Sequence, residues 1–476
     1  RFVAGVAHTR GQGSTAGYHR HPDYHLCPPR RVEMEMLGPG ESVSSFTEVV
    51  KGYSEEQAKQ EADRCVECGI CVATCPAHMD VPDYIRSIRD GDYEKGLQLM
   101  YRTNPFPATC GRICTRRCES VCPVGIQGEP VAIRWLKRFI VDQVEDSDYA
   151  RILPEVADDT GKRVAIVGAG PGGLSTAYYL RLKGHAVSVF EAQSRPGGML
   201  RYGVPGYRLP DEALDKDIEY IRSLGVEIHL NHSVGRETAF TSLLEDYDAV
   251  FVSTGLNVPS KMRIQGEDHP RAMAGLTLLD DVANGRDPQI GGSVAVIGGG
   301  NVAMDAARVS RRLGAEVTVL YRRRIEDMPA DTEEIEESQA EGCTFVTQAI
   351  PLEAMDAEQE GKVVLKWGEA EMVPDPGGGR PRPVLQEDRM HLDTFDTIIS
   401  AIGQGSNLDY IPAGIADQLQ IKWGKFIPGD YQQMVVQKLF VGGDVANATA
   451  DAISAIEDGH HAARGIDRFL STGQRS

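Results

Sequence analysis

The sequence predicts an α/β protein in which a helical, cysteine-rich N-terminal domain precedes two Rossmann-like dinucleotide-binding domains. Two observations predict this architecture. Eight of the ten cysteines lie between residues 65 and 122. Further along, two segments each show a buried-strand pattern that runs into a glycine-rich turn and then a helix. A chain of 476 residues with 41% hydrophobic residues can build two or three such domains.

The charge and the hydropathy of the chain exclude two classes of partner. The net charge of −19 argues against nucleic acid. No stretch approaches the roughly 18 apolar residues that a membrane span needs. We therefore expect partners that are small molecules and other proteins.

The first 50 residues are expected to form an extended arm. They are rich in His, Gly, Pro and Arg and lack clear periodicity. A metal site at His19, His21, His25 and Cys27 is one interpretation, but the neighbouring Pro and Arg residues favour a strap that lies over another surface.

Residues 51–155 are expected to form the helical cluster domain. Ser54 and Gln57 make a capping box, and the helix that they open should run into Cys65. The remaining helices are predicted at 81–90, 92–103 and 130–145.

The cysteines of this domain form two runs. These are Cys65-x2-Cys68-x2-Cys71-x3-Cys75-Pro76 and Cys110-x3-Cys114-x3-Cys118-x3-Cys122-Pro123. The first run has the spacing of a bacterial ferredoxin, and eight thiolates are the ligand set of two [4Fe–4S] clusters. Disulfides are typical of short secreted chains, and zinc usually takes paired Cys-x2-Cys knuckles, so both fit less well. Clusters imply a reducing, oxygen-poor cytoplasm, so a cytoplasmic protein is expected.

The first glycine turn follows the strand pattern that begins at Arg163. In it Gly168 permits the tight turn, Gly170 lets the backbone approach a pyrophosphate, and Gly173 lets helix and strand pack closely. The helix from Leu174 to Lys183 would meet the phosphate with its N-terminus. A second strand, 186–190, leads to an acid that can bind a ribose. The candidate residues of this turn are Gly168, Gly170, Pro171, Gly173 and Glu191.

The same fingerprint returns after the strand that begins at Ser293. Ala303 takes the place of the third glycine, which the fingerprint permits. The candidate residues are Gly298, Gly300, Asn301 and Val302.

The second site lacks the ribose acid. Counting 23 residues from Gly298, as from Gly168 to Glu191, leads to Tyr321, which three arginines follow. Guanidinium groups in place of a carboxylate favour a 2′-phosphate, so Arg322 and Arg323 predict NADPH, with NADH possible. A solvated basic turn after a strand is the alternative.

The residues around the first site assign it to FAD. Gly198, Met199 and Leu200 suit close backbone contact with a flavin. Near the C-terminus, Gly443 and Asp444 follow a strand, and the acid could bond a ribityl hydroxyl. The helix predicted at 450–456 could turn its amide end toward the flavin and stabilise the reduced anion; its candidate residues are Ala452 and Ile453.

Taken in order, these motifs resemble the small (beta) subunit of NADPH-dependent glutamate synthase. The resemblance covers roughly residues 40–470 and extends to the large subunit of the electron-bifurcating ferredoxin:NADP transhydrogenase and to part of dihydropyrimidine dehydrogenase. The segments that carry it are the cysteine domain, both fingerprints, 202–210, Ser253-Thr254-Gly255, Tyr321-Arg322-Arg323, Met328-Pro329-Ala330, Ala401-Ile402-Gly403 and Gly443-Asp444. It adds Thr254, Gly255 and Gly403 as cofactor-binding candidates.

The resemblance implies a glutathione-reductase-like pair of domains. The NADP(H)-binding domain, at 289–385, is inserted into an FAD-binding domain formed by 160–288 and 386–476. Relatives can complete one cluster with a Glu or Gln on the helix after the cysteines, but this chain reads Arg134-Trp-Leu-Lys137 there. Cys110 is therefore the candidate for the eighth ligand. The expected division is Cys65, Cys68, Cys71 and Cys122 for one cluster, with Cys75, Cys110, Cys114 and Cys118 for the other.

The expected function is hydride transfer between NADPH and FAD with one-electron transfer through two [4Fe–4S] clusters. The electrons would go to or come from a partner subunit or a ferredoxin, within a hetero-oligomer. An electron-bifurcating transhydrogenase-type subunit is the alternative, because both use the same motifs. The FAD domain has no Cys-x2-Cys redox pair, so disulfide reduction is not expected. No side chain is assigned as catalytic.

Overall fold

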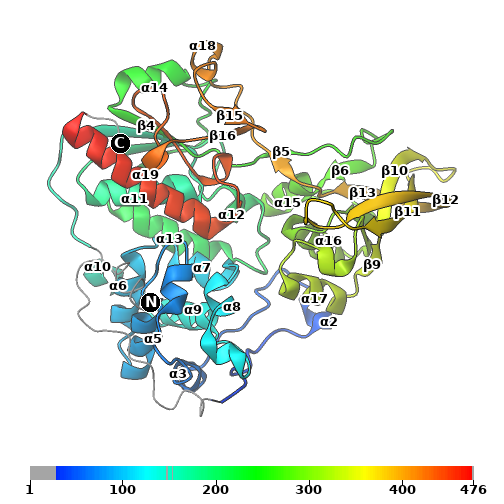
Figure 1. Cartoon of the computed structure of the whole chain (residues 1–476), viewed down its shortest axis with the longest axis horizontal. Helices are drawn as coiled ribbons and strands as arrows, with labels where there is room; N and C mark the ends of the chain where they lie inside the picture. Colours follow the sequence, from blue (N-terminus) through cyan, green and yellow to red (C-terminus); the bar gives the residue numbers. More distant parts are fainter. Residues whose placement is uncertain (1–27, 146–147, 153, 474–476) are drawn as a thin grey trace.

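The computed structural model describes residues 28–145, 148–152 and 154–473. A helical part, a sheet-and-helix part above it and a second sheet-and-helix part to the right are visible in Figure 1. Within the described ranges, no helix is both long and apolar enough to cross a membrane. The expected metal site at His19, His21, His25 and Cys27 lies outside the described residues.

The helical part begins with the predicted capping box. The Ser54 hydroxyl accepts a hydrogen bond from the Gln57 amide, and the Gln57 side chain accepts one from the Ser54 amide. The helix ends at Ala62 and a turn leads to Cys65, so it is slightly shorter than expected. The helices are α3 (Glu55–Ala62), α4 (Ile70–Thr74), α5 (Val81–Asp90), α6 (Tyr93–Tyr101), α7 (Pro107–Ile113), α8 (Arg117–Ser120), α9 (Ile133–Gln143) and α10 (Tyr149–Ile152).

The first sheet has five parallel strands in the order β17-β4-β1-β2-β3. Four of the five β1 residues are buried, as is typical of a central parallel strand. The strands are β1 (Arg163–Val167), β2 (Ala186–Phe190), β3 (Glu227–His229), β4 (Ala249–Val252) and β17 (Leu439–Val441). The helices are α11 (Pro171–Leu182), α12 (Met199–Tyr202), α13 (Asp211–Ser223), α14 (Phe240–Asp246), α18 (Ala413–Ala416) and α19 (Ala452–Thr472).

The second sheet also has five parallel strands, in the order β6-β13-β7-β8-β9. They are β6 (Ala272–Ala274), β7 (Ser293–Ile297), β8 (Glu316–Tyr321), β9 (Thr344–Thr347) and β13 (Thr397–Ser400), with helices α15 (Gly275–Ala283), α16 (Asn301–Arg312) and α17 (Thr332–Ala340). An antiparallel sheet adjoins it, formed by β10 (Ala349–Asp356), β11 (Val363–Val373) and β12 (Arg382–Phe395). Two short ribbons pair β5 (Val258–Pro259) with β14 (Gln404–Gly405) and β15 (Ile421–Lys422) with β16 (Lys425–Phe426).

The second sheet is an insertion in the first. The chain leaves the first sheet after β4 and returns to it only at β17, which pairs with β4. Strands β6 and β13 belong to the second sheet although they lie outside the expected range 289–385. Strands of three and four residues are too short to show periodicity in the sequence.

The helical part and the first sheet share one hydrophobic core. The ring of Tyr101 from α6 stacks on that of Tyr220 from α13, with centroids 3.9 Å apart. The Tyr178 hydroxyl of α11 donates a hydrogen bond to the Tyr101 carbonyl at 3.0 Å. These contacts hold the cysteine loops against the first nucleotide-binding sheet.

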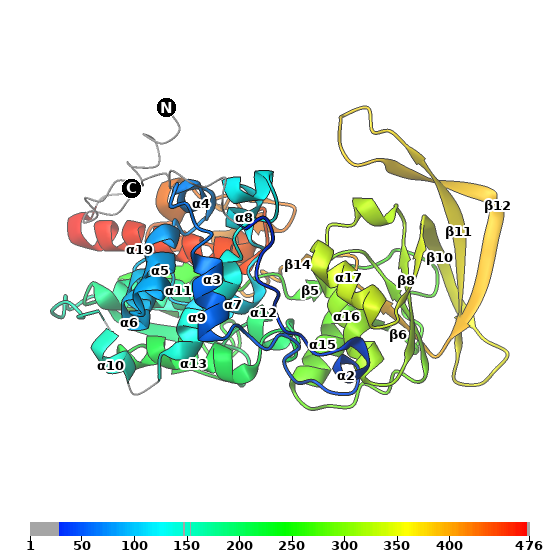
Figure 2. The same cartoon turned by 90° about the horizontal axis from the view of Figure 1, so that it is seen from below.

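The described end of the arm runs from the helical part to the second sheet's domain, where Val49 packs in that domain's hydrophobic core. Its helix α2 (Pro39–Ser42) lies at the lower edge of this domain in both views (Figure 1 and Figure 2). The Leu37 amide donates to the Val49 carbonyl, which closes a loop around α2. The Val49 amide donates to Tyr207 in the first sheet's domain. This segment therefore contacts more than one part of the molecule.

Candidate cofactor-binding sites

The first group of thiols surrounds a small cavity. Cys65, Cys68, Cys71 and Cys122 line it together with apolar side chains such as Ile85. Gly69 has a left-handed backbone with φ of 77°, which turns the chain sharply between Cys68 and α4. Two loops that are far apart in the sequence therefore supply one site.

The second group of thiols surrounds a lysine. Lys137 is 4% exposed and interacts electrostatically with Cys75, Cys110, Cys114 and Cys118. Burial alone would lower the pKa of Lys137, but these thiols raise it above its ordinary value. The structure thus brings four thiols to the cavity and four around Lys137, and Cys71 of the first group also interacts with Cys118 of the second. The division of these thiols between two clusters stays a prediction.

Neither set suits a single metal ion. Among the described residues, no three His, Cys, Asp or Glu side chains converge closely enough to hold one ion. A zinc ion would need every ligand sulfur about 2.3 Å from one point. A four-iron cluster spreads its ligands over four corners and fits sulfurs that surround a cavity.

The first glycine turn leaves no room for side chains. Gly168 has φ of 102°, and a Cβ atom there would lie 2.5 Å from the Ser253 carbonyl oxygen. A Cβ atom on Gly173 would lie 1.9 Å from the Gly168 oxygen, so α11 packs directly on the strand. A Cβ atom on Gly198 would come within 3.0 Å of the Gly170 Cα. Three backbone segments therefore meet at this turn.

Glu191 lies beside the same turn, at the end of β2. Its Oε2 accepts a hydrogen bond from the Ala169 amide and its Oε1 one from the Gln193 amide, both at 2.8 Å. Burial raises the pKa of Glu191, although these amides oppose the shift. The carboxylate is held rigidly where a ribose hydroxyl could donate to it.

The carboxyl ends of β1, β4 and β17 bring the other first-site candidates together. Val167, Val252 and Val441 are in register across the three strands, so the residues that follow them lie side by side. The list of candidates at this edge is Gly168, Pro171, Thr254, Gly255, Gly443 and Asp444, with Met199 and Leu200 at the start of α12. Thr254 hydrogen-bonds to Tyr410 at 3.2 Å.

Asp444 has an unsatisfied buried oxygen. Its Oδ1 has no hydrogen-bond partner among the described residues, and burial raises the pKa of this carboxyl to about 6. A buried carboxylate oxygen is costly without a donor. Nearby, α19 begins at Ala452 rather than at Ala450, because Asp451 caps it by accepting from the Ser454 amide at 2.9 Å. Ala452 and Ile453 thus form its first turn.

The second glycine turn has the same construction. A Cβ atom on Gly298 would lie 2.2 Å from the Ala401 oxygen, whereas Gly300 faces open space. Asn301 and Val302 begin α16 directly after it. Gly403, with φ of 129°, follows β13 close to this edge.

The three arginines after β8 differ in their contacts. Arg322 is exposed and makes no hydrogen bond or ion pair with any described residue. The Arg323 Nε donates to the Pro381 carbonyl at 2.8 Å, and Arg324 pairs with Asp327 at 3.0 Å. Only Arg322 has its whole guanidinium free for a ligand.

Sequence reasoning missed one contact between the sites. Arg117 of α8 forms an ion pair with Asp451, the cap of α19, and approaches the Ser454 hydroxyl at 3.4 Å. Cys118 is the next residue on α8. The second thiol group is thereby linked to the helix that begins at the first nucleotide site, and no local pattern in the sequence could have revealed a contact over 334 residues.

Comparisons with known proteins agree with this arrangement. Residues 42–149 match the family described as dihydropyrimidine dehydrogenase domain II, 4Fe-4S cluster, and residues 162–463 match pyridine nucleotide-disulphide oxidoreductase. The chain is 37% identical over 441 residues to the NADP(+)-dependent formate dehydrogenase subunit beta of Moorella thermoacetica, covering 85% of this chain and 60% of that one. It therefore spans less than two thirds of that relative.

Two further comparisons cover more of the other protein. The glutamate synthase [NADPH] small chain of Escherichia coli (strain K12) is 33% identical, over 89% of this chain and 94% of that chain. The structure of Mycobacterium tuberculosis FprA in complex with NADPH superposes with a TM-score of 0.55 at 19% identity, over 66% of this chain and 85% of that one. At that identity the superposition establishes the fold.

Proposed function

Because the chain belongs to the pyridine nucleotide-disulphide oxidoreductase family, in the branch that includes the glutamate synthase small chain, we propose that it transfers electrons between NADPH and a partner protein. It is an NADPH-dependent oxidoreductase that binds FAD and [4Fe–4S] iron–sulfur centres. The number of clusters, their ligands and the partner are our proposals.

The residues of the first site fit FAD. The unsatisfied Oδ1 of Asp444 would accept a hydrogen bond from a ribityl hydroxyl, and Glu191 would accept one from a hydroxyl of the adenosine ribose. The glycines at 168 and 170 would let the backbone approach the pyrophosphate. Bound FAD would supply the exchange between a two-electron hydride and single electrons. The amides of Ala452 and Ile453 at the start of α19 would stabilise negative charge beside them.

The residues of the second site fit NADP(H). The open face of Gly300 admits a pyrophosphate at the N-terminus of α16. Arg322 would bind the 2′-phosphate with a guanidinium that no described residue engages. NADH lacks that phosphate, so this contact supports NADPH as the preferred cofactor, with NADH as a weaker one.

The two sets of four thiols support two [4Fe–4S] clusters. We assign Cys65, Cys68, Cys71 and Cys122 to one and Cys75, Cys110, Cys114 and Cys118 to the other. Lys137 would then offset the negative charge of the second cluster from within the protein.

The observation that carries the proposal is the link from Arg117 to Asp451. It supports a path in which the second cluster lies between the flavin site and the first cluster. Cys68 and Cys122 of the first cluster are partly exposed, and Ile126, in the turn that follows Cys122, is 84% exposed. We therefore propose that a partner subunit or a ferredoxin docks near Cys122, within a cytoplasmic hetero-oligomer.

An anaerobic titration of the chain with NADPH and then NADH tests this function. Flavin absorbance and the electron paramagnetic resonance signals of the clusters would be followed together. We expect NADPH to bleach the flavin and to place electrons on one or two [4Fe–4S] centres. If the flavin is reduced while the clusters stay oxidised, the bifurcating transhydrogenase-type role replaces the proposed one. If NADPH does not reduce the flavin, both are wrong.

A further inference from the structure

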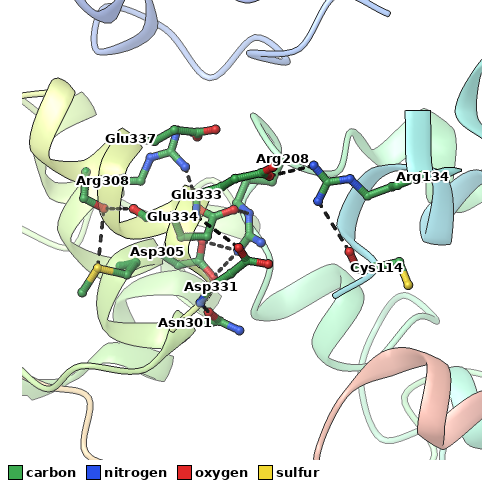
Figure 3. Close-up of polar contacts among 12 residues, drawn as sticks. Cys114, Arg134, Arg208, Asn301, Asp305, Arg308, Asp331, Glu333, Glu334 and Glu337 are labelled. Atoms are coloured by element: carbon green, nitrogen blue, oxygen red, sulfur yellow. Dashed lines mark hydrogen bonds and ion pairs between the residues drawn. The ribbon is translucent and has the colours of Figure 1, made fainter. Parts of the chain in front are cut away.

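The start of α17 is ion-paired to the cluster domain. Arg116, just before α8, binds Asp331 at 2.6 Å and also pairs with Glu333. Arg134 of α9 binds the other oxygen of Glu333 at 2.8 Å. Figure 3 shows Glu333 between Arg134 and the acidic side chains around α16 and α17. Two neighbouring carboxylates, Asp331 and Glu333, thus join the second sheet's domain to the helices that carry the thiols, and only Glu333 contacts Arg134.

This contact continues to a cofactor site at each end. On one side, the Arg134 guanidinium donates to the Cys114 carbonyl at 3.5 Å. On the other, Asp331 caps α17 by accepting from the Glu333 amide at 3.1 Å, and its own amide donates to Asn301 Oδ1 at 2.8 Å. Asn301 is the first residue of α16, directly after the glycine turn.

Arg134 is confined to this position. Its side chain is 9% exposed, and its guanidinium lies 3.9 Å above the Trp135 ring. Its backbone amide donates to Glu119 at 2.9 Å. The Arg134 guanidinium is therefore buried between Cys114 and Glu333, and a change of charge near Cys114 acts on its pairing with Glu333.

We propose that Glu333 is a positioning residue that couples nucleotide binding at Asn301 to the charge on the cluster held by Cys114. This inference rests on the proposed function. An added electron near Cys114 attracts the Arg134 guanidinium and weakens its pair with Glu333. The start of α17 then loosens, and with it the contact from Asp331 to Asn301. The reduced protein consequently binds the nucleotide more weakly, which favours release of the oxidised cofactor after its electrons have moved on.

The test uses 2′-phospho-ADP-ribose, which has the 2′-phosphate and pyrophosphate but no nicotinamide to be reduced. Its Kd would be measured by anaerobic calorimetry on the full, cofactor-loaded chain, both oxidised and reduced with dithionite. We expect the Kd to rise about fivefold or more on reduction, within the usual range of coupling between sites. In Glu333→Gln, the ratio of the Kd of the reduced protein to the Kd of the oxidised protein should be close to one.

A matched control is Glu219→Gln on α13. Glu219 is 63% exposed and pairs with Arg222 on its own helix. This variant should keep the wild-type ratio. A ratio that survives in Glu333→Gln would show that the coupling comes from the flavin and would overturn the inference.

A second readout follows from reciprocity. If reduction weakens nucleotide binding, the nucleotide must lower the midpoint potential of the cluster. Redox titrations monitored by electron paramagnetic resonance, with and without 2′-phospho-ADP-ribose, should show this shift in the wild type and not in Glu333→Gln. If that variant loses iron or flavin, Arg116→Gln weakens the same junction from the other side.

The wild type alone can overturn the inference. Normal cluster signals and normal probe binding with a Kd ratio of one would refute the coupling and leave the proposed function intact. Absence of cluster signals, or of probe binding, would instead contradict the proposed function and the inference together.

Discussion

Arg322, Arg323 and Arg324 are adjacent in sequence, but the fold gives each a different task. Arg324 caps a local turn through Asp327, and Arg323 supports the backbone at Pro381. Arg322 alone is left for a ligand. The sequence suggested that Arg322 and Arg323 act together on the 2′-phosphate, whereas their contacts favour an unequal division.

Replacing these arginines one at a time tests that division. Arg322→Ala should raise the KM for NADPH about tenfold or more, because it removes one charge-assisted hydrogen bond to the 2′-phosphate. The KM for NADH should stay within about twofold of the wild-type value. Arg323→Ala should affect both cofactors alike, because it removes a backbone support. Steady-state kinetics with each cofactor measures both. Equal losses with NADPH and NADH in Arg322→Ala would contradict the assignment.

Cys110 decides the count of clusters. It is 1% exposed on α7 and faces Lys137 with the other thiols of its group. Cys110→Ser should reduce the iron content from about eight to about four per chain, because one four-iron cluster loses a ligand. Iron analysis of the anaerobically purified variant measures this. The control is Cys343→Ser, a buried thiol in the second sheet's domain, which should keep the full iron content.

The helices of the cluster domain depend on elements outside it. Helix α7 has no side-chain cap of its own, and Asp217 of α13 takes that role. Its carboxylate accepts from the Ala108 amide at 3.2 Å and from the Thr109 amide and hydroxyl at 2.8 Å. The domain of the first sheet thereby completes the helix that carries Cys110.

Asp217 also predicts a dependence of stability on pH. Burial raises the pKa of Asp217 from 3.8 to about 7, although the hydrogen bonds from Thr109 and Ala108 oppose it. Between these values the folded protein holds a proton that the unfolded chain has released. This carboxyl therefore lowers stability as pH rises from about 4 to about 7, and the effect levels off above pH 7.

Asp217→Asn should abolish that slope. At pH 5 the variant should be less stable by about 1–3 kcal/mol, because an amide cannot accept from all the α7 donors. Toward pH 8 the difference in unfolding free energy between the wild type and Asp217→Asn should become smaller, because the wild type loses stability as Asp217 ionises. Denaturant unfolding at several pH values measures it, with Glu219→Gln on the exposed face of α13 as control. A constant difference across pH would show that Asp217 does not titrate in this range.

Across the molecule, the second sheet's domain is held against its neighbours by buried charges. Arg208, from the loop before α13, binds both oxygens of Asp305 at 2.7 and 2.9 Å and Glu334 at 2.8 Å. Asp305 is 3% exposed, and burial raises its pKa to about 6. A hydride donor and acceptor on separate domains need this kind of fixed alignment.

Removing this guanidinium should loosen the domain. Arg208→Met leaves Asp305 and Glu334 buried with one cation fewer, at a cost of about 3–5 kcal/mol. Relative to the wild type at the same pH, the α16 amides should lose protection from hydrogen exchange, and they should lose more at pH 8 than at pH 5, where Asp305 can take up a proton. The control is Arg286→Met, at an exposed pair with Asp280, which should leave the protection of α16 close to that of the wild type. If hydrogen exchange of the α16 amides is unchanged in Arg208→Met, this guanidinium does not hold the second sheet's domain in place.

Local patterns in the sequence were enough for the central elements of both glycine-turn folds, for several cluster-domain helices and for the classes of cofactor. The capping box at Ser54, the glycine turns at 168 and 298 and the cysteine spacings each act within a few residues, where chain geometry limits the outcome. Element ends shifted by a few residues, as at α3 and α19, because caps and turns compete locally.

The contacts between the sites were decided only by the tertiary structure. Arg117 with Asp451, Arg134 with Glu333, and Asp217 with α7 join residues 108 to 334 positions apart. Such pairs depend on how the helices pack, because a side chain acquires a distant partner only after both elements are placed. The spacing of cysteines and glycines could therefore indicate which cofactors bind, whereas packing determines how their sites are connected.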